Sequence, residues 1–256
     1  MSSCKLRVEN EMRVRIGTSG FSYKEWKGSF YPEKLPAAKM LAFYAARFDA
    51  VEINNTFYRM PKPGALAAWT RDVAEAPDFA FALKAPVYLS FLGKGKAALE
   101  QPVRHFLELT AELGARAGPI YLQLPTTMKK DTAGLRALLE LVPPRVRLAI
   151  EPGNESWLAD DVYATLRDRG AALCTIDDPK KTVPLVATSD FGYLRLRRTK
   201  YTKAALAAWA DRILEQPWRE AWVFFKHEDE ATGPRLAAAF QGALAARARA
   251  VVHARA

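Results

Sequence analysis

The chain is poor in the residues and segments that mark secreted and membrane proteins. Its 256 residues include only two cysteines, Cys4 and Cys174, which lie far apart in the sequence. This separation argues against a disulfide framework and for a reducing compartment. No uninterrupted apolar stretch approaches the roughly 20 residues of a membrane span, and residues 1–13 lack the apolar centre of a signal peptide. The sequence therefore predicts a cytoplasmic protein that does not enter a membrane.

Patterns typical of metal sites are also missing. The chain has three histidines, and neither His-x-x-x-His nor Cys-x-x-Cys occurs in it. Of these, His105 falls on a predicted helix and His253 in the last few residues. Carboxylates at strand ends keep a divalent metal open as an alternative, but we assign no metal ligand, and the cofactor is unknown.

Acidic residues are outnumbered, because 28 Asp and Glu face 38 Lys and Arg, for a net charge of +10 at pH 7. A basic excess attracts nucleic acid or anionic metabolites, although much of it is explained by side chains on solvent-facing helices. One cluster differs from that background, since residues 195–203 are basic and lie at the end of a predicted strand and in the loop after it.

Eight short apolar runs are spaced along the chain, and each ends in a polar or charged residue. They are residues 14–18, 50–54, 79–84, 120–123, 146–151, 172–177, 193–197 and 222–227. Strand followed by helix, repeated eight times, is the pattern of a closed parallel (β/α)8 barrel of the TIM type. The chain length suits one such barrel, and no internal repeat or linker divides it. We predict a single α/β barrel domain over residues 13–248, with a flexible tail at 1–12 and a basic tail at 249–256.

The segments between the strands carry helical periodicity in most places. We expect helices at 36–47, 64–74, 99–113, 131–141, 156–169, 202–215 and 233–248. Asp131 and Ser156 are the expected N-caps of two of them. The stretch 178–190 has two prolines, two adjacent lysines and little periodicity, so the sixth helix of the barrel should be shortened or replaced by a loop.

The carboxyl ends of the strands of such a barrel gather at one mouth, where its chemistry is carried out. Strand alternation places Glu52 and Asn54 on the same face, pointing inward. A buried carboxylate is costly unless it is paired or hydrogen-bonded, so Glu52 must be satisfied or functional. We take Glu52, Glu151 and Asp177 as the candidate acid/base residues. The alternative is a buried ion-pair network with Lys84, Arg195 and Lys226 that only fills the barrel.

Several segments match the pattern of a known group. They are GTSGFSYKEWKGSFYP at 17–32, VEINNTFYRMP at 51–61, Phe81-x-Leu83-Lys84-Ala85-Pro86, Leu122–Pro125, Glu151-Pro152 with Ser156-Trp157, Asp177-x-Pro179 and residues 193–196. With these motifs the chain resembles the family called domain of unknown function 72, or YecE-like. The resemblance covers nearly the whole chain and implies a TIM barrel, but it implies no activity.

Two positions depart from the pattern of that family. An arginine is usual near Gly153, and a histidine is usual where Arg197 stands. A cationic contact at the fifth strand is therefore lost, and Arg197 is the residue expected to compensate for it.

We expect a ligand to be held by side chains on the strand ends and on the aromatic first loop, with Arg195, Arg197 and Lys226 binding its negative charge. The candidate binding residues are Ser19, Tyr23, Trp26, Asn54, Tyr58, Arg59, Lys84, Gln123, Trp157, Arg195, Arg197, Lys226 and His227.

Three hypotheses for function follow. The first is an enzyme, of the hydrolase or lyase type, that acts on an anionic, phosphate-bearing small molecule or nucleotide. The second is a barrel that binds or processes nucleic acid, and the third is a non-catalytic anion-binding protein. The sequence does not determine the oligomeric state.

Overall fold

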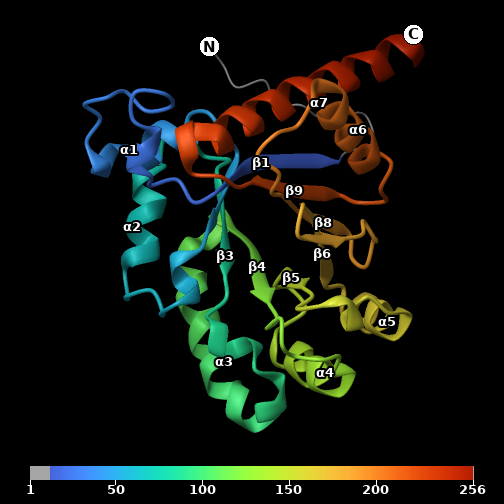
Figure 1. The fold of residues 1–256 in the computed structure, drawn as a ribbon. Coiled ribbons are helices and arrows are strands. Elements are labelled where there is room, and N and C mark those ends of the chain that lie inside the picture. Colours follow the sequence, from blue (N-terminus) through green and yellow to red (C-terminus); the bar gives the residue numbers. More distant parts are fainter. Residues whose placement is uncertain (1–11, 256) are drawn as a thin grey trace.

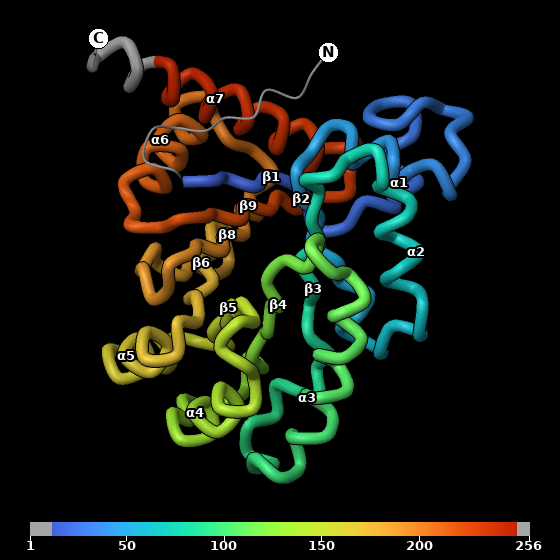
Figure 2. Tube along the Cα trace, turned by 180° about the vertical axis from the view of Figure 1, so that it is seen from behind, coloured from blue at the N-terminus to red at the C-terminus, as the bar shows by residue number. Residues whose placement is uncertain are grey.

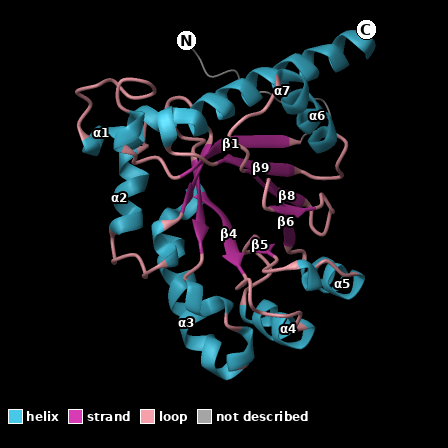
Figure 3. Cartoon of the chain, viewed as in Figure 1, coloured by secondary structure: helices cyan, strands magenta, loops and turns pink. Residues whose placement is uncertain are grey.

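The computed structural model describes the backbone of residues 12–255 and the side chains of residues 12–249. Cys4 and the expected N-terminal tail, apart from Met12, therefore lie outside the described residues. Within them, strands and helices alternate along the chain, and the helices surround the strands (Figures 1 and 3).

The predicted parallel barrel is confirmed. Its eight parallel strands are β1 (Arg13–Ser19), β2 (Ala50–Ile53), β3 (Ala80–Lys84), β4 (Ala117–Gln123), β5 (Leu148–Glu151), β6 (Ala172–Asp178), β8 (Phe191–Leu196) and β9 (Glu220–Phe225). Neighbours in the barrel pair in parallel, β9 returns to pair with β1, and β5 pairs with β6 to close the sheet. Closure leaves no exposed edge among these strands and brings their carboxyl ends to one mouth.

The described part of the chain forms seven α-helices, and Figures 1 and 2 show helices around the outside of the barrel from opposite sides. They are α1 (Ala37–Ala45), α2 (Ala65–Asp72), α3 (Lys96–Thr110), α4 (Thr132–Leu141), α5 (Asp160–Arg169), α6 (Lys203–Leu214) and α7 (Thr232–Arg255). α7 continues through residue 255, so the stretch 249–255 that we expected as a separate tail is helical.

One predicted helix cap is confirmed and one is wrong. The Asp131 carboxylate accepts a hydrogen bond from the backbone nitrogen of Gly134 at 2.8 Å, as an N-cap does. Ser156 instead belongs to a single 3-10 turn, Glu155–Trp157. α5 begins only at Asp160, where Asp160 and Asp161 place negative charge at the positive end of the helix dipole.

The sixth helix is missing, as expected, but its replacement is more ordered than a loop. A short strand, β7 (Lys181–Val183), folds back and pairs antiparallel with β6, with Asp178 opposite Lys181. The Asp178 side chain accepts a hydrogen bond from the backbone nitrogen of Lys180 at 2.8 Å, which stabilises the turn. This hairpin brings Lys181 to the mouth of the barrel.

The bottom of the barrel is closed by charged and aromatic side chains. Arg15 donates from Nε to Glu220 at 2.6 Å, and Arg147 pairs with the other oxygen of the same carboxylate. The guanidinium of Arg15 lies 5.0 Å from the centre of the Trp222 ring, and that of Arg147 lies 5.3 Å from it. The carboxylate of Glu220 therefore balances two cations in a largely buried layer.

We predict that Glu220→Gln lowers the free energy of unfolding by about 3 kcal/mol, because two arginines lose their shared counter-charge. Denaturant unfolding measures the change. The matched control is Glu140→Gln, whose carboxylate pairs with Lys96 on the exposed surface and should have little effect. Equal losses in the two variants would show that the layer at the bottom contributes no more than a surface pair.

Candidate functional site

Arg195 lies at the centre of the mouth, between two carboxylates from different sides of the barrel. Its Nη2 is 2.9 Å from Glu52 Oε1, and its Nη1 is 3.0 Å from Glu151 Oε2. Arg195 is 4 % exposed and both carboxylates are fully buried. We expected these residues to meet at the mouth, and they form one cluster.

Glu52 accepts hydrogen bonds from three further side chains. Ser19 Oγ and Asn54 Nδ2 reach Oε1 at 2.7 and 3.2 Å, and the Tyr193 hydroxyl reaches Oε2 at 2.7 Å. Burial alone would raise the pKa of Glu52, but Arg195 and the hydrogen-bond donors outweigh burial and lower it. Glu52 is therefore a stable anion that has used its acceptor capacity.

Glu151 is satisfied in the same way. It accepts from the Tyr121 hydroxyl, from Gln123 Nε2 at 2.7 Å and from Lys181 Nζ at 2.9 Å, in addition to Arg195. Burial opposes ionisation here as well, yet Arg195 and Lys181 lower the pKa of Glu151 to about 2. Both carboxylates thus hold Arg195 and its neighbours in place.

Two tyrosines that the sequence analysis missed support this cluster from within the barrel. The rings of Tyr121 and Tyr193 stack with centres 5.4 Å apart and planes 7° apart, and the Arg195 guanidinium lies 4.6 Å from the Tyr121 ring. The missed signal was strand alternation. Tyr121 precedes Gln123 by two residues and Tyr193 precedes Arg195 by two, so each points inward with its predicted neighbour.

Lys84, at the end of β3, has a neutral partner. Its Nζ donates to Gln123 Oε1 at 2.7 Å and lies 3.8 Å from the centre of the Phe57 ring. Burial, followed by the nearby charge of Arg195, lowers the pKa of Lys84 to about 8, although Glu52 and Glu151 oppose this change. A substantial fraction of Lys84 is thus a neutral amine at a pH near 8.

The rim of the mouth carries Arg197, Lys226 and His227, all half-buried. Arg197 Nε lies 3.5 Å from Asp178, and the His227 ring contacts the carbonyl oxygen of Arg197 at 2.6 Å. Lys226 makes no ion pair with any described residue, and burial together with Arg197 lowers its pKa. Arg197 and Lys226 therefore place positive charge on the rim.

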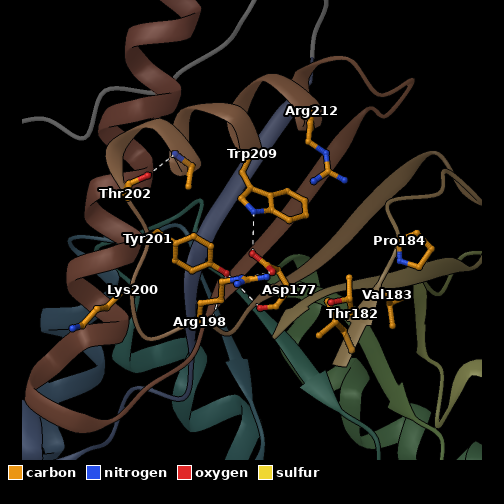
Figure 4. Close-up of a pocket in the computed structure, with 12 residues that line it drawn as sticks. Asp177, Thr182, Val183, Pro184, Arg198, Lys200, Tyr201, Thr202, Trp209 and Arg212 are labelled. Atoms are coloured by element: carbon orange, nitrogen blue, oxygen red, sulfur yellow. Dashed lines mark hydrogen bonds and ion pairs between the residues drawn. The ribbon is translucent and has the colours of Figure 1, made fainter. Parts of the chain in front are cut away.

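Asp177 does not join the cluster. Its carboxylate accepts from Arg198 Nε at 2.6 Å and from Trp209 Nε1 at 3.2 Å. It lines a separate cavity of about 500 Å³ between the β6–β7 hairpin and α6 (Figure 4). Cys174, by contrast, lies in the field of Glu151 and Arg195. Alternation along β6 therefore turns Asp177, three residues later, to the outside.

The aromatic candidates mostly serve as packing. Trp26 and Trp157 are buried, and their indole nitrogens donate to the backbone oxygens of Glu228 and Met128, both at 2.9 Å. The Tyr23 hydroxyl donates to the backbone oxygen of Ser19 at 2.8 Å, which fixes the first loop beside the mouth. Tyr58 is exposed, with its ring against Phe57.

Arg59 is also exposed, and no described residue forms an ion pair with it. The described residues contain no group of three or more His, Cys, Asp or Glu side chains placed to hold a metal ion. No described helix is both long and apolar enough to cross a membrane.

Comparison with known proteins shows to which family the chain belongs. The sequence model for the protein of unknown function DUF72 matches residues 15–256. The chain belongs to the DUF72 family. The UPF0759 protein YecE of Escherichia coli K12 is 30 % identical over 131 residues, which is 50 % of this chain and 46 % of that relative. The matched region thus spans about half of the curated relative.

Solved DUF72 structures share the barrel. The family member from Thermotoga maritima MSB8 superposes with a TM-score of 0.75 and 26 % identity, covering 90 % of this chain and 98 % of that one. The member from Enterococcus faecalis V583 gives a TM-score of 0.73 at 20 % identity, covering 90 % and 95 % of the two chains, and supports the fold alone.

Gly153, one of the departures from the DUF72 pattern, occupies a tight place after β5. A Cβ atom added there would lie 2.0 Å from the backbone oxygen of Pro125. A larger side chain therefore does not fit this backbone without a shift of one loop. The lysine beside Glu151 at the end of β5 is Lys181. It comes from the segment that we expected to be a loop.

We predict that Lys181→Met weakens the acid dependence of stability. The pKa of Glu151 lies below its value in the unfolded chain, so its stabilisation is present above about pH 4.5 and is lost as the pH falls toward 2. Without Lys181 this depression shrinks, and the loss between pH 6 and 3 should be smaller by about 1 kcal/mol.

Denaturant unfolding at each pH measures the loss, with Lys39→Met on the exposed surface of α1 as the matched control. An identical pH dependence in wild type and Lys181→Met would contradict the coupling between Lys181 and Glu151.

Proposed function

We propose that this DUF72 protein is an enzyme that acts on an anionic small molecule by acid/base chemistry at the barrel mouth. The observation that carries the proposal is the division of charge there. Glu52 and Glu151 are fully occupied by Arg195, Lys181 and neutral donors. Lys84 and Lys226 are left with no carboxylate partner among the described residues. A substrate anion would supply the missing negative charge.

The geometry changes the roles that the sequence analysis gave to these residues. Arg195 was expected to hold the anion, but its two terminal nitrogens already contact carboxylates. Its buried Nε is the atom left without a hydrogen-bond partner. Arg197 and Lys226 are the better candidates to bind the substrate, because both lie on the accessible rim.

Proton transfer is assigned to Lys84 rather than to the carboxylates. An acid/base group works best when its pKa lies near the working pH. The pKa values of Glu52 and Glu151 are lowered from 4.5 and so move further from neutral pH. The pKa of Lys84 is lowered from 10.5 to about 8 and so moves toward neutral pH. Asp177 points away from the mouth and has no place in this scheme.

We predict that sulfate raises the melting temperature of the wild-type protein and that Lys226→Met and Arg197→Met each lose most of this protection. Sulfate is a suitable probe because its charge is constant across the pH range used. Each substitution removes one rim cation, which should weaken binding about 10-fold, the equivalent of one charge-assisted hydrogen bond. A thermal-shift titration measures the change.

Lys39→Met is the control for the general stabilisation of proteins by sulfate. Protection that is equal in all four proteins would contradict an anion site at the mouth. Stronger protection by a single-stranded oligonucleotide, with a steep loss on adding salt, would favour the nucleic-acid alternative. An anion that binds while Lys84 titrates as an ordinary lysine would favour a non-catalytic binding protein.

A further inference from the structure

Two hydrogen bonds in series connect Lys84 to Glu151 through the side chain of Gln123. The Glu151 carboxylate therefore forms no direct hydrogen bond with the amine of Lys84. Gln123 Nε2 donates to Glu151 Oε1 at 2.7 Å, so its carbonyl oxygen is turned toward Lys84 Nζ. Lys181 occupies the same Glu151 oxygen at 2.9 Å. Lys84 is thus fixed in position by a neutral acceptor and is spared the ion pair that would keep it protonated.

The charges that face Lys84 come from three strands, β2, β5 and β8. Arg195 and Arg197 at the end of β8 disfavour its ammonium form, and Glu52 on β2 and Glu151 on β5 favour it. Because Arg195 lies directly on both carboxylates, their effect at Lys84 is largely cancelled. The pKa of about 8 corresponds to about 300-fold more neutral amine at pH 7 than an ordinary lysine has.

Lys84 also has an apolar wall. The face of the Phe57 ring lies 3.8 Å from Nζ, and the Tyr121 ring lies 5.6 Å away. Such rings keep water from one side of the amine and stabilise a cation on the nitrogen. A positioned, partly neutral amine against an aromatic wall is the arrangement that a lysine nucleophile requires.

We propose that Lys84 forms an imine with the carbonyl carbon of an anionic substrate, an oxo acid. This rests on the proposed function, in which Arg197 and Lys226 hold the anionic group, and it makes the neutral amine of Lys84 the nucleophile of this step in place of the proton carrier. The Nζ lone pair attacks the carbonyl carbon, a C–N bond forms, and the electron pair of the C=O bond moves to oxygen, which takes a proton. Nitrogen loses one proton, the hydroxyl group takes a second proton from solvent and leaves as water, and the nitrogen lone pair forms the C=N bond of a protonated imine.

One amine, one carbonyl group and one proton thus give one protonated imine and one water, with no change of oxidation state. The protonated imine is a cation at the position of the original ammonium, beside Phe57. It draws electrons from the bonds next to the former carbonyl carbon, as lyase chemistry requires. The imine therefore favours a lyase over a hydrolase.

Reductive trapping tests the proposal. The whole protein is incubated at pH 7 with glyoxylate and cyanoborohydride, which reduces an imine to a stable carboxymethyl amine, and the modified lysines are located by peptide mass spectrometry. We expect Lys84 to be labelled at least 10-fold faster than the exposed Lys39, and sulfate to slow its labelling. Lys84→Arg should lose the fast label, and Lys39→Arg should keep it.

The wild-type measurements decide the outcome even if Lys84→Arg fails to fold. Labelling of Lys84 no faster than that of Lys39 would overturn the imine, and it would leave the proposed function standing if sulfate still protects the protein. Acetaldehyde, a neutral carbonyl, separates the two claims further. If it labels Lys84 as fast as glyoxylate does, and sulfate has no effect, the imine stands and the anion site fails.

Discussion

The ion pairs of Arg195 with Glu52 and Glu151 are the constraint on which the rest of the mouth depends. Two carboxylates buried in a barrel would repel each other and would lose their hydration at a cost of several kcal/mol each. One guanidinium from β8 lies within 3.0 Å of both. Neighbouring side chains then supply further hydrogen bonds, so the buried charges are satisfied in the way that native interiors require. The donors are Ser19, Asn54 and Tyr193 to Glu52, and Tyr121, Gln123 and Lys181 to Glu151.

This arrangement determines what the other charged residues can do. Because the carboxylates are occupied, they are poor proton carriers and do not neutralise the lysines above them. Lys84 is left with Gln123, and Lys226 on the rim has no ion-pair partner among the described residues. A network that only filled the barrel would be expected to pair its lysines as well. The amines of Lys84 and Lys226, which have no carboxylate partner among the described residues, are therefore the groups on which the proposed chemistry rests.

Much of the fold and part of the site were predictable from the sequence. Apolar runs that end in polar residues located the eight parallel strands, and alternation correctly placed Glu52 and Asn54 inside. Asp177 was expected at the mouth because it is a carboxylate at a strand end, but its position in the alternation of β6 turns it to the outside of the barrel. Lys181 was missed since its position depends on a hairpin in a segment with no periodic pattern. Trp26 and Trp157 show a further limit, because a buried ring and one that faces a ligand look alike in sequence.

The pKa of Lys84 is the quantity that most directly tests whether Arg195 neutralises the two carboxylates and leaves the lysine above them without a counter-charge. It can be measured by NMR titration of the protein with 13C-labelled lysine, using Lys84→Arg to assign the signal. We expect a midpoint of about 8 for this one lysine. A midpoint at the ordinary value of 10.5 would contradict this expectation, because the ammonium form of Lys84 would then be as stable as that of a lysine in water.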